Sequence, residues 1–140
     1  MTNFNQILLI DNDLLLMDTL EMVLEAEGFA ARVFGSSPKA LNYLEGQKEA
    51  QQPMPDLILC DQIMPEMTGL ELFELLKADH QLGYLPFILL TGDVSKKASK
   101  DELGLDGVVI KPFHLSELLD EVNRVLHQAV GFHEASACIV

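Results

Sequence analysis

The sequence predicts an α/β fold in which a doubly wound, five-stranded parallel sheet carries helices on both faces. Five short aliphatic runs alternate along the chain with segments whose apolar residues recur at the helical period. Parallel strands need crossover connections, which helices supply, so this alternation favours a parallel sheet over an antiparallel one. The chain has 140 residues, 49% of them hydrophobic, which suits one domain with a substantial core.

The five predicted strands are short aliphatic runs that end in polar or turn-forming residues. QILLI, DLILCD and FILL are continuous, which is typical of strands buried on both faces. FAARVFG alternates between larger apolar and smaller or polar residues, and GVVI is again aliphatic. We expect these strands over residues 6–10, 29–35, 56–61, 87–90 and 107–110.

Five helices are expected between and after the strands. In the first, Leu16, Leu20 and Leu24 recur at the helical period, and Gly28 is a natural stop. The second begins at a Ser-Pro pair, because proline suits the first helical turn. We expect the helices over residues 14–27, from residue 37 to a loop at 46–55, and over 70–78, 94–103 and 115–129, with no clear pattern in residues 130–140.

Composition and charge exclude several classes of function. The 22 acidic and 9 basic residues give a formal net charge of −13, so phosphate backbones and anionic lipids would repel the chain. No apolar run is long enough to span a bilayer, and the start MTNFNQ does not resemble a signal peptide. Cys60 and Cys138 do not indicate a disulfide framework. We expect a cytoplasmic protein that binds neither nucleic acid nor membrane directly.

Polar side chains stand where four of the five strands end. They are Asp11, Asn12 and Asp13 after the first strand, Asp61 at the third, Thr91 at the fourth and Lys111 at the fifth. Ligands of doubly wound sheets bind outside the carboxyl ends of the strands, where the strand order reverses. We therefore expect two acids, a hydroxyl and an ammonium to converge at this edge, although they lie far apart in the chain.

Together these groups suit phosphoryl transfer assisted by a divalent cation. Asp11 and Asp61 side by side repel each other unless a cation lies between them, and Mg²⁺ usually takes one or two protein carboxylates. Thr91 offers a hydroxyl and Lys111 a compact positive charge, both of which suit phosphoryl oxygens. An aspartate beside a cation can act as a nucleophile toward phosphorus. The residues alone thus predict a Mg²⁺-assisted acyl-phosphate site.

Four segments resemble the signature segments of a response-regulator receiver domain, the phospho-acceptor part of two-component signalling: ILLIDND, DLILCDQIMPEMTGLEL, PFILLTGDV and VVIKPFHLSELL. They occur in the family's order, and the resemblance covers roughly residues 5–128. It implies the flavodoxin-like strand order 2-1-3-4-5, a receiver domain over residues 1–129 and a C-terminal tail over 130–140. It also implies a signalling switch, which can lose its phosphoryl group by itself, and no turnover enzyme.

The resemblance also assigns roles to individual residues. Asp61 is the expected phospho-acceptor, and Thr91 and Lys111 are expected to hold the phosphoryl oxygens. The implied Mg²⁺ ligands are the side chains of Asp11, Asn12 and Asp61 and the backbone carbonyl of Ile63. The implied donor is a phosphohistidine on a sensor histidine kinase or a histidine phosphotransfer protein.

Two positions depart from the family's usual pattern. The family usually has two adjacent acids after the first strand, and the second is here Asn12, which keeps an oxygen ligand but loses a negative charge. We therefore expect weaker Mg²⁺ binding. Asp13 could shift inward to compensate, but we favour a role as the cap of the following helix. Val108 stands where the family commonly has a signalling tyrosine or phenylalanine, so output here would use backbone and helix shifts or a different aromatic residue, for which Phe113 and Tyr84 are the candidates.

Two further positions tune the lifetime of the phosphorylated state in the family. Apolar Ile63 would not position an attacking water, whereas Asp93 could, and we expect a phosphorylated form that lives for minutes or longer. The resemblance places the output surface on the fourth helix, the fifth strand and the last helix, where a homodimer could also form. Its candidate residues are Val108, Lys96, Lys97 and Lys100. The chain is expected to act as a stand-alone switch on an unknown downstream protein.

Two alternatives differ in chemistry. A receiver that has lost phosphorylation would act as a docking module, which Asn12 and Val108 favour and the retained Asp61 opposes. A phosphatase of the haloacid-dehalogenase type would use Asp11 as its nucleophile, in the Asp-x-Asp pattern DND, but Leu15 stands where that family has threonine or valine. The aspartate that becomes phosphorylated distinguishes the phosphatase from the receiver.

Overall fold

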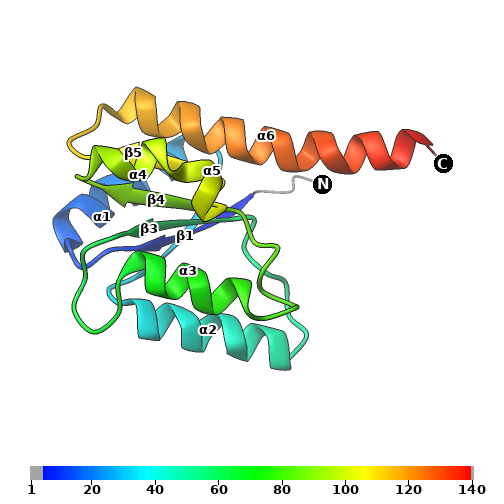
Figure 1. Ribbon diagram of the computed structural model, residues 1–140, viewed down its shortest axis with the longest axis horizontal. Coiled ribbons are helices and arrows are strands. Elements are labelled where there is room, and N and C mark those ends of the chain that lie inside the picture. Colours follow the sequence, from blue (N-terminus) through cyan, green and yellow to red (C-terminus); the bar gives the residue numbers. More distant parts are fainter. Residues whose placement is uncertain (1–4, 140) are drawn as a thin grey trace.

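The computed structural model describes residues 5–139, and the side chains of residues 5–128. Five parallel strands form one sheet in the order β2-β1-β3-β4-β5, which confirms the predicted fold class (Figure 1). The strands are β1 Gln6–Ile10, β2 Ala30–Phe34, β3 Leu57–Asp61, β4 Phe87–Thr91 and β5 Gly107–Ile110. Each strand boundary lies within one residue of its predicted position.

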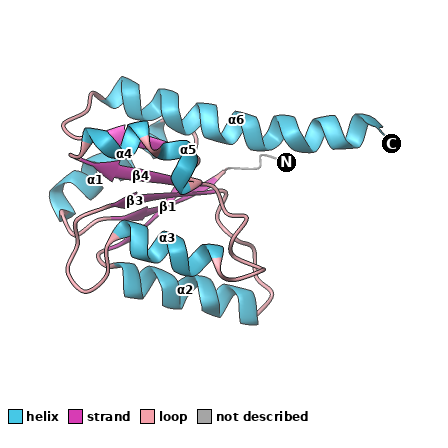
Figure 2. Ribbon diagram, in the orientation of Figure 1, coloured by secondary structure: helices cyan, strands magenta, loops and turns pink. Residues whose placement is uncertain are grey.

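Helices cover both faces of the sheet and enclose two hydrophobic layers (Figure 2). One layer lies between the sheet and helices α1 (Leu14–Ala26) and α6 (Leu115–Ile139), and the other lies under α2 (Ser37–Glu49) and α3 (Gly69–Lys77). Alternate residues of each strand face one layer or the other, which is why continuous aliphatic runs form these strands.

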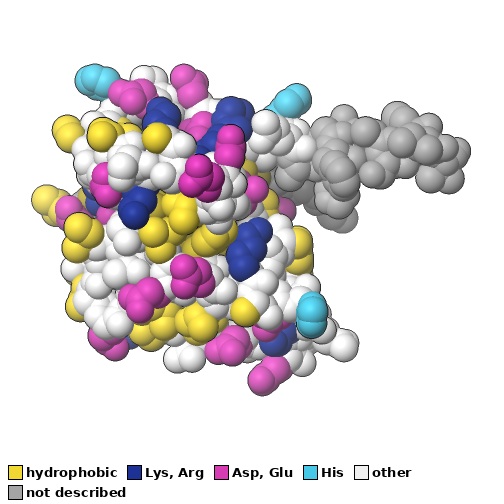
Figure 3. Space-filling view, in the orientation of Figure 1, with side chains coloured by type: hydrophobic (Ala, Val, Ile, Leu, Met, Phe, Trp, Pro, Cys, Tyr) yellow, Lys and Arg dark blue, Asp and Glu magenta, His cyan; other side chains and the backbone are white. Residues whose placement is uncertain are grey.

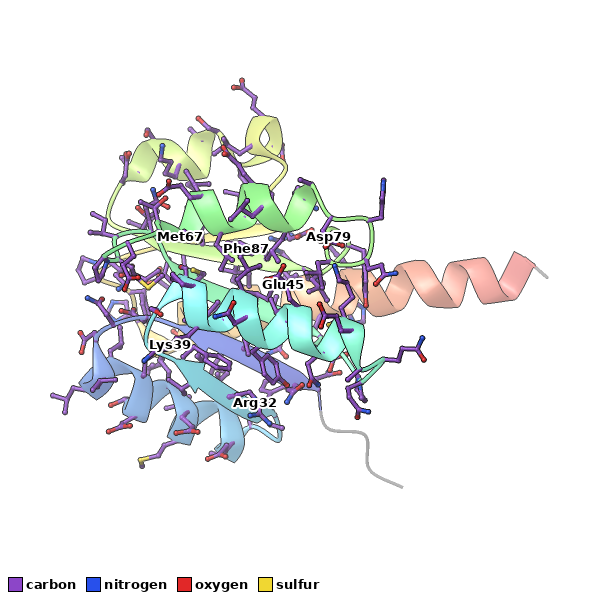
Figure 4. The ribbon with its side chains drawn as sticks, turned by 90° about the horizontal axis from the view of Figure 1, so that it is seen from below. Arg32, Lys39, Glu45, Met67, Asp79 and Phe87 are labelled. Atoms are coloured by element: carbon purple, nitrogen blue, oxygen red, sulfur yellow. The ribbon has the colours of Figure 1, made fainter. Side chains whose placement is uncertain are left out.

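The layer under α2 and α3 includes a pair of buried aromatic rings. Figure 4 looks onto these two helices, with the labelled Phe87 of β4 beneath them. The rings of Phe87 and Phe73 lie 5.1 Å apart between centroids, in a tilted arrangement that aromatic pairs favour. At the surface of the same layer, an ion pair of 2.7 Å joins Lys48 of α2 to Asp79, which follows α3.

Three helices differ from their predictions. α2 runs to Glu49, so the predicted loop over residues 46–55 begins too early, and Gln47 of α2 folds the remaining loop back by donating to the Pro53 carbonyl at 3.0 Å. The single helix predicted over 94–103 is two, α4 (Val94–Ala98) and α5 (Lys100–Leu103), because Ser99 leaves the helical conformation. α6 continues to Ile139 and extends well beyond the rest of the molecule (Figure 1).

Side-chain caps place the first turns of two helices at the carboxyl edge of the sheet. Asp13 caps α1 by accepting the Leu16 N–H at 3.1 Å, which confirms the predicted cap. Thr68 and Glu71 form a reciprocal capping box at the start of α3. Gly28 follows α1 with φ of 94°, a left-handed conformation that glycine adopts readily.

The described surface carries mixed charge. On the face shown in Figure 3, acidic and basic side chains are interspersed with hydrophobic ones, and no continuous basic patch covers the described part of this face. No helix within residues 5–139 combines the length and the apolar character that crossing a lipid bilayer requires.

Candidate phosphoryl-acceptor site

Three of the predicted site residues meet at the carboxyl edge of the sheet. Lys111 Nζ lies 3.1 Å from Oδ2 of Asp11 and 3.0 Å from Oδ1 of Asp61, so one ammonium bridges two carboxylates. Asp11 is fully buried and Asp61 is 8% exposed. Two buried acids with one cation leave an excess negative charge, which a divalent cation would offset.

The strand register explains why these residues meet. Ile10 pairs with Cys60 across β1 and β3, which places the next residues, Asp11 and Asp61, at neighbouring strand ends. Lys111 follows β5, two strands away from Asp61, and its long side chain spans that distance. Three residues from distant parts of the chain thus form one group because their strands end together.

Thr91 ends β4, the strand between Asp61 and Lys111, and is 2% exposed. Its Oγ1 accepts the Asp93 N–H at 3.1 Å. Side chains alternate between the two faces of the sheet along each strand. By this alternation the Thr91 side chain leaves β4 toward α2 and α3, whereas the Asp61 side chain leaves β3 toward α1 and α6. Thr91 therefore lies beside the ion-paired group. Its carbonyl accepts the Lys111 N–H at 2.8 Å, but within residues 5–128 its hydroxyl forms no hydrogen bond to Asp61 or Lys111.

Burial and charge act in opposite directions at this site. Burial and the negative charge of Asp11 raise the pKa of Asp61 above its ordinary value, and Lys111 offsets only part of this effect. Burial alone would lower the pKa of Lys111, but its hydrogen bonds to Asp61 and Asp11 raise it overall. Lys111 therefore stays charged at neutral pH, and Asp61 is a more basic carboxylate than an exposed aspartate.

The loop after β1 uses its three polar residues differently. Asp11 faces Lys111 with Oδ2 and accepts the Asp13 N–H with Oδ1 at 3.0 Å. Asp13 itself is exposed and capped onto α1, so it does not replace the missing second acid. Asn12, between them, is exposed at the rim of the site.

The donor set fits a Mg²⁺ ion without filling its coordination shell. Mg²⁺ usually binds one or two protein carboxylates and completes its shell with water and phosphate oxygens, and Asp11 and Asp61 supply two carboxylates here. Within the described residues, no cluster of three or more His, Cys, Asp or Glu side chains could hold a metal ion. An acid at position 12 would add a third carboxylate to the site, and Asn12 supplies an amide there instead.

The loop after β3 is held by close backbone contacts. Gly69 begins α3 directly against β3, where a Cβ would lie 2.6 Å from the Asp61 carbonyl oxygen and 2.8 Å from Leu89 Cδ1. Gln62 accepts the Leu70 N–H with Oε1 at 2.9 Å, and its carbonyl accepts the Gly69 N–H at 3.1 Å. Sequence reasoning missed Gln62, whose only signal is a polar side chain directly after Asp61.

One predicted output residue is not on the surface. Val108 is 2% exposed and belongs to the hydrophobic layer under α2 and α3, because it is an interior residue of β5 that alternates toward that layer. The prediction of Val108 as a surface residue is therefore wrong. Lys97 is exposed on α4, while Lys96 and Lys100 are partly buried on α4 and α5.

Of the two residues predicted to tune the lifetime of the phosphorylated state, Ile63 is exposed to solvent and Asp93 is bonded to a neighbouring helix. Ile63 is 78% exposed in the loop after Asp61. Asp93 caps α4, because its Oδ1 accepts the N–H of Ser95 at 3.0 Å and the hydroxyl of Ser95 at 2.7 Å. These bonds lower the pKa of Asp93, so its carboxylate stays charged and remains bonded to the first turn of α4.

Known proteins share both the sequence pattern and the fold. The chain matches the response regulator receiver domain family over residues 7–123. It is 30% identical over 133 residues to the DNA-binding dual master transcriptional regulator RpaA of Synechocystis, covering 94% of this chain and 53% of that protein. It is 32% identical over 125 residues to the DNA-binding response regulator MtrA of Mycobacterium tuberculosis, covering 88% and 51%. The chain spans about half the length of these curated relatives.

Two solved structures illustrate the likeness of fold. The chemotaxis response regulator CheY4 of Vibrio cholerae is 26% identical with a TM-score of 0.74, over 88% of this chain and 99% of that one. The receiver domain of a signal transduction histidine kinase from Syntrophus aciditrophicus is 28% identical with a TM-score of 0.74, over 89% and 91%. The family match spans all the site residues described above, and the chain belongs to the response regulator receiver domain family of two-component signalling.

Proposed function

We propose that this chain accepts a phosphoryl group on Asp61 in a two-component system. The observation that carries the proposal is the bridge from Lys111 to Asp11 and Asp61, at 3.1 and 3.0 Å. A buried carboxylate of raised pKa beside a fixed ammonium suits nucleophilic attack on phosphorus. Membership of the receiver family argues against the phosphatase alternative, in which Asp11 would be the nucleophile.

The proposed step conserves charge and electrons. A carboxylate oxygen of Asp61 forms a bond to phosphorus, the bond from phosphorus to the donor's histidine nitrogen breaks, and its electron pair returns to that nitrogen. The acyl phosphate then carries about two negative charges at Asp61. Lys111 is close enough to pair with a phosphoryl oxygen, and the Thr91 hydroxyl has a hydrogen to donate to another.

Asp11, Asp61 and the backbone carbonyl of Ile63 would hold Mg²⁺ at this edge. When bound, the ion supplies positive charge that offsets the phosphoryl oxygens during transfer. Asn12 contributes an amide oxygen where a second acid would add a full charge. We therefore propose that Mg²⁺ binds here more weakly than at a site with a third carboxylate.

The proposed donor is a phosphohistidine on a sensor kinase or a phosphotransfer protein. Leu14 and Leu15, which are 67% and 80% exposed, begin α1 at the same edge as Asp61, and Ile63 is 78% exposed directly after it. Exposed aliphatic side chains around a charged site suit contact with another protein. The surface therefore supports a protein donor.

The proposed output is a protein contact and no direct contact with nucleic acid. The formal net charge of −13 would repel phosphate backbones. RpaA and MtrA are described as DNA-binding proteins, and this chain spans about half the length of either one, so the proposal concerns the described domain alone. Thr91 lies at the start of the loop to α4, so a shift of that loop would reach Lys96, Lys97 and Lys100. These residues would then form a contact surface for a downstream protein or for a second copy of the chain.

We further propose a slow loss of the phosphoryl group. Asp93, which could have positioned a water, is committed to Ser95, and Ile63 is apolar. Timing the loss of the acyl phosphate after removal of the donor tests this proposal. A half-life of minutes or longer is expected, and a half-life of seconds contradicts it.

Intact mass after incubation with Mg²⁺ and acetyl phosphate tests the acceptor. The chain should gain the mass of one phosphoryl group, and Asp61→Asn should abolish the gain. Asp56→Asn is the matched control, because Asp56 lies at the opposite end of the same strand. A gain that survives in Asp61→Asn contradicts the proposal. A folded chain that gains nothing favours the docking module, for which Asn12 is the observation.

A further inference from the structure

An open depression lies beside the acceptor site, between the loops that follow β3 and β4. Its volume is about 460 Å³. The residues that line it are Gln62, Ile63, Thr91, Gly92, Asp93 and Lys96. It adjoins the site through Gln62 and Ile63, which directly follow the acceptor, and through Thr91. The outer part of a phosphodonor bound over Asp61 would therefore lie next to this depression.

Lys96 is the basic residue that lines the depression. Lys111, the cation of the site itself, is already shared between Asp11 and Asp61. Lys96 is partly buried, lines the depression and forms no ion pair within residues 5–128, although its charge acts on the nearby Asp93, which is already bonded to Ser95. Lys97 has the same charge on the same helix, but it is exposed and does not line the depression.

The charge on the donor's leaving group distinguishes two kinds of phosphodonor. When an acyl phosphate transfers its phosphoryl group, a carboxylate departs with a full negative charge. When a phosphoramidate does so, the nitrogen departs as a neutral amine after it takes up a proton. A chain with a net charge of −13 opposes the first departure more than the second, unless a cation lies near the departing group.

We propose that Lys96 is a specificity-determining residue, which favours small acyl phosphates as direct donors to Asp61. The inference rests on the proposed acceptor function. An oxygen of Asp61 bonds to phosphorus, the bond from phosphorus to the acyl oxygen breaks, and its electron pair leaves on the carboxylate. The ammonium of Lys96 stabilises that developing charge from the depression, without taking up or giving a proton.

Phosphorylation rates with two donors test this inference. Acetyl phosphate and phosphoramidate are supplied with Mg²⁺ to the unmodified chain, Lys96→Gln, Lys96→Arg and Lys97→Gln, and intact mass gives each rate. Lys96→Gln should lower the acetyl phosphate rate by about three- to tenfold and the phosphoramidate rate by less than about twofold. Lys96→Arg should retain most of the acetyl phosphate rate. Lys97→Gln should leave both rates unchanged, although it removes the same net charge.

Each other outcome overturns the inference. Equal effects of Lys96→Gln and Lys97→Gln would show that only net charge matters. An equal loss with both donors would show that Lys96 does not act on the leaving group. If the unmodified chain gains no mass from either donor, the proposed acceptor function itself is wrong. If the unmodified chain reacts and Lys96→Gln reacts at the same rates, only this inference is wrong.

Discussion

The two edges of the sheet both carry aspartates, and they use them in opposite ways. At the amino edge, Asp56 precedes β3 and Asp106 precedes β5. Each exchanges two hydrogen bonds with the first residue of a neighbouring strand. Asp56 accepts the Gln6 N–H at 2.7 Å and donates its own N–H to the Gln6 carbonyl at 2.8 Å, while Asp106 does the same with Phe87 at 2.8 and 3.2 Å.

At the carboxyl edge, the carboxylates of Asp11 and Asp61 face each other across one ammonium. Within the described residues neither acid forms a reciprocal pair with a neighbouring strand, although Asp11 accepts the Asp13 N–H, and burial raises the pKa of Asp61. An acid before a buried strand thus bonds to the backbone of the neighbouring strand, whereas the two acids at the strand ends are buried and share one ammonium. We infer that the amino edge stabilises the fold, and we propose that the carboxyl edge holds the charges used in phosphoryl transfer.

Lys111→Met should produce the largest effect, because it removes the only cation between two buried acids. We expect the free energy of unfolding to fall by about 2–3 kcal/mol, less than for a fully buried pair because Lys111 is partly exposed. Urea denaturation at neutral pH measures the change. Lys97→Met is the control and should stay within about 0.5 kcal/mol of the unmodified chain. Equal stability of both variants would show that the carboxyl edge does not depend on this bridge.

Alanine at the amino-edge aspartates should weaken the fold without touching the chemistry. Asp106→Ala should lower the free energy of unfolding by about 1–2 kcal/mol and the more exposed Asp56→Ala by about 1 kcal/mol or less, since each leaves a strand N–H without its acceptor. Urea denaturation gives the stability, and intact mass after treatment with acetyl phosphate gives the extent of phosphorylation. A phosphorylation defect in either folded variant would remove the distinction between the edges.

Asp61→Asn should stabilise the chain modestly, by about 1 kcal/mol at neutral pH, because the amide is not penalised by burial or by Asp11. The sign follows from the raised pKa of Asp61. Below its ordinary value of 3.8, the acid is protonated in both the folded and the unfolded chain, so the two proteins should differ little. Folding disfavours the carboxylate, so the advantage of the variant should grow as pH rises through the folded pKa and then level off.

Thermal unfolding of the unmodified chain and Asp61→Asn across this pH range measures that difference. An advantage of Asp61→Asn that shrinks with rising pH would reverse the electrostatics described for the carboxyl edge.

Asn12→Asp should have the smallest effect, a gain of about threefold or more in Mg²⁺ affinity from one added carboxylate. Calorimetric titration of the folded chain with Mg²⁺ measures it, with Asp13→Asn as a control that leaves the acids at the site unchanged. Unaltered affinity in Asn12→Asp would show that the rim position of Asn12 does not reach the ion.

Most of the fold could be predicted because four of the five strands, all except β2, are almost entirely buried on both faces. Aliphatic runs such as QILLI have few other structures open to them, and their polar ends indicated the site. The division of the helix at residues 94–103 depends on Ser99, which is compatible with a helix in sequence and departs from it only in tertiary context. The extension of α2 past Gly46 has the same origin, since glycine is tolerated inside a helix.

The finer features of the site depend on geometry that the chain order does not encode. The sequence predicted that Asp11, Asp61 and Lys111 would converge, but not that one ammonium would bridge both acids. Val108 was expected at the surface because of its place in a motif, whereas alternation along β5 buries it. The sequence did not predict that Asp93 caps α4, which follows from its hydrogen bonds with Ser95 in the structure.

Locating the phosphoryl group in the chain tests the central claim most directly. After treatment with acetyl phosphate and Mg²⁺, reduction with borohydride converts an aspartyl phosphate to homoserine, and peptide mass mapping then identifies the modified residue. The account predicts homoserine at Asp61, with Asp11 and the amino-edge residues Asp56 and Asp106 unmodified. Homoserine at Asp11 or at either amino-edge aspartate, with Asp61 intact, would contradict it.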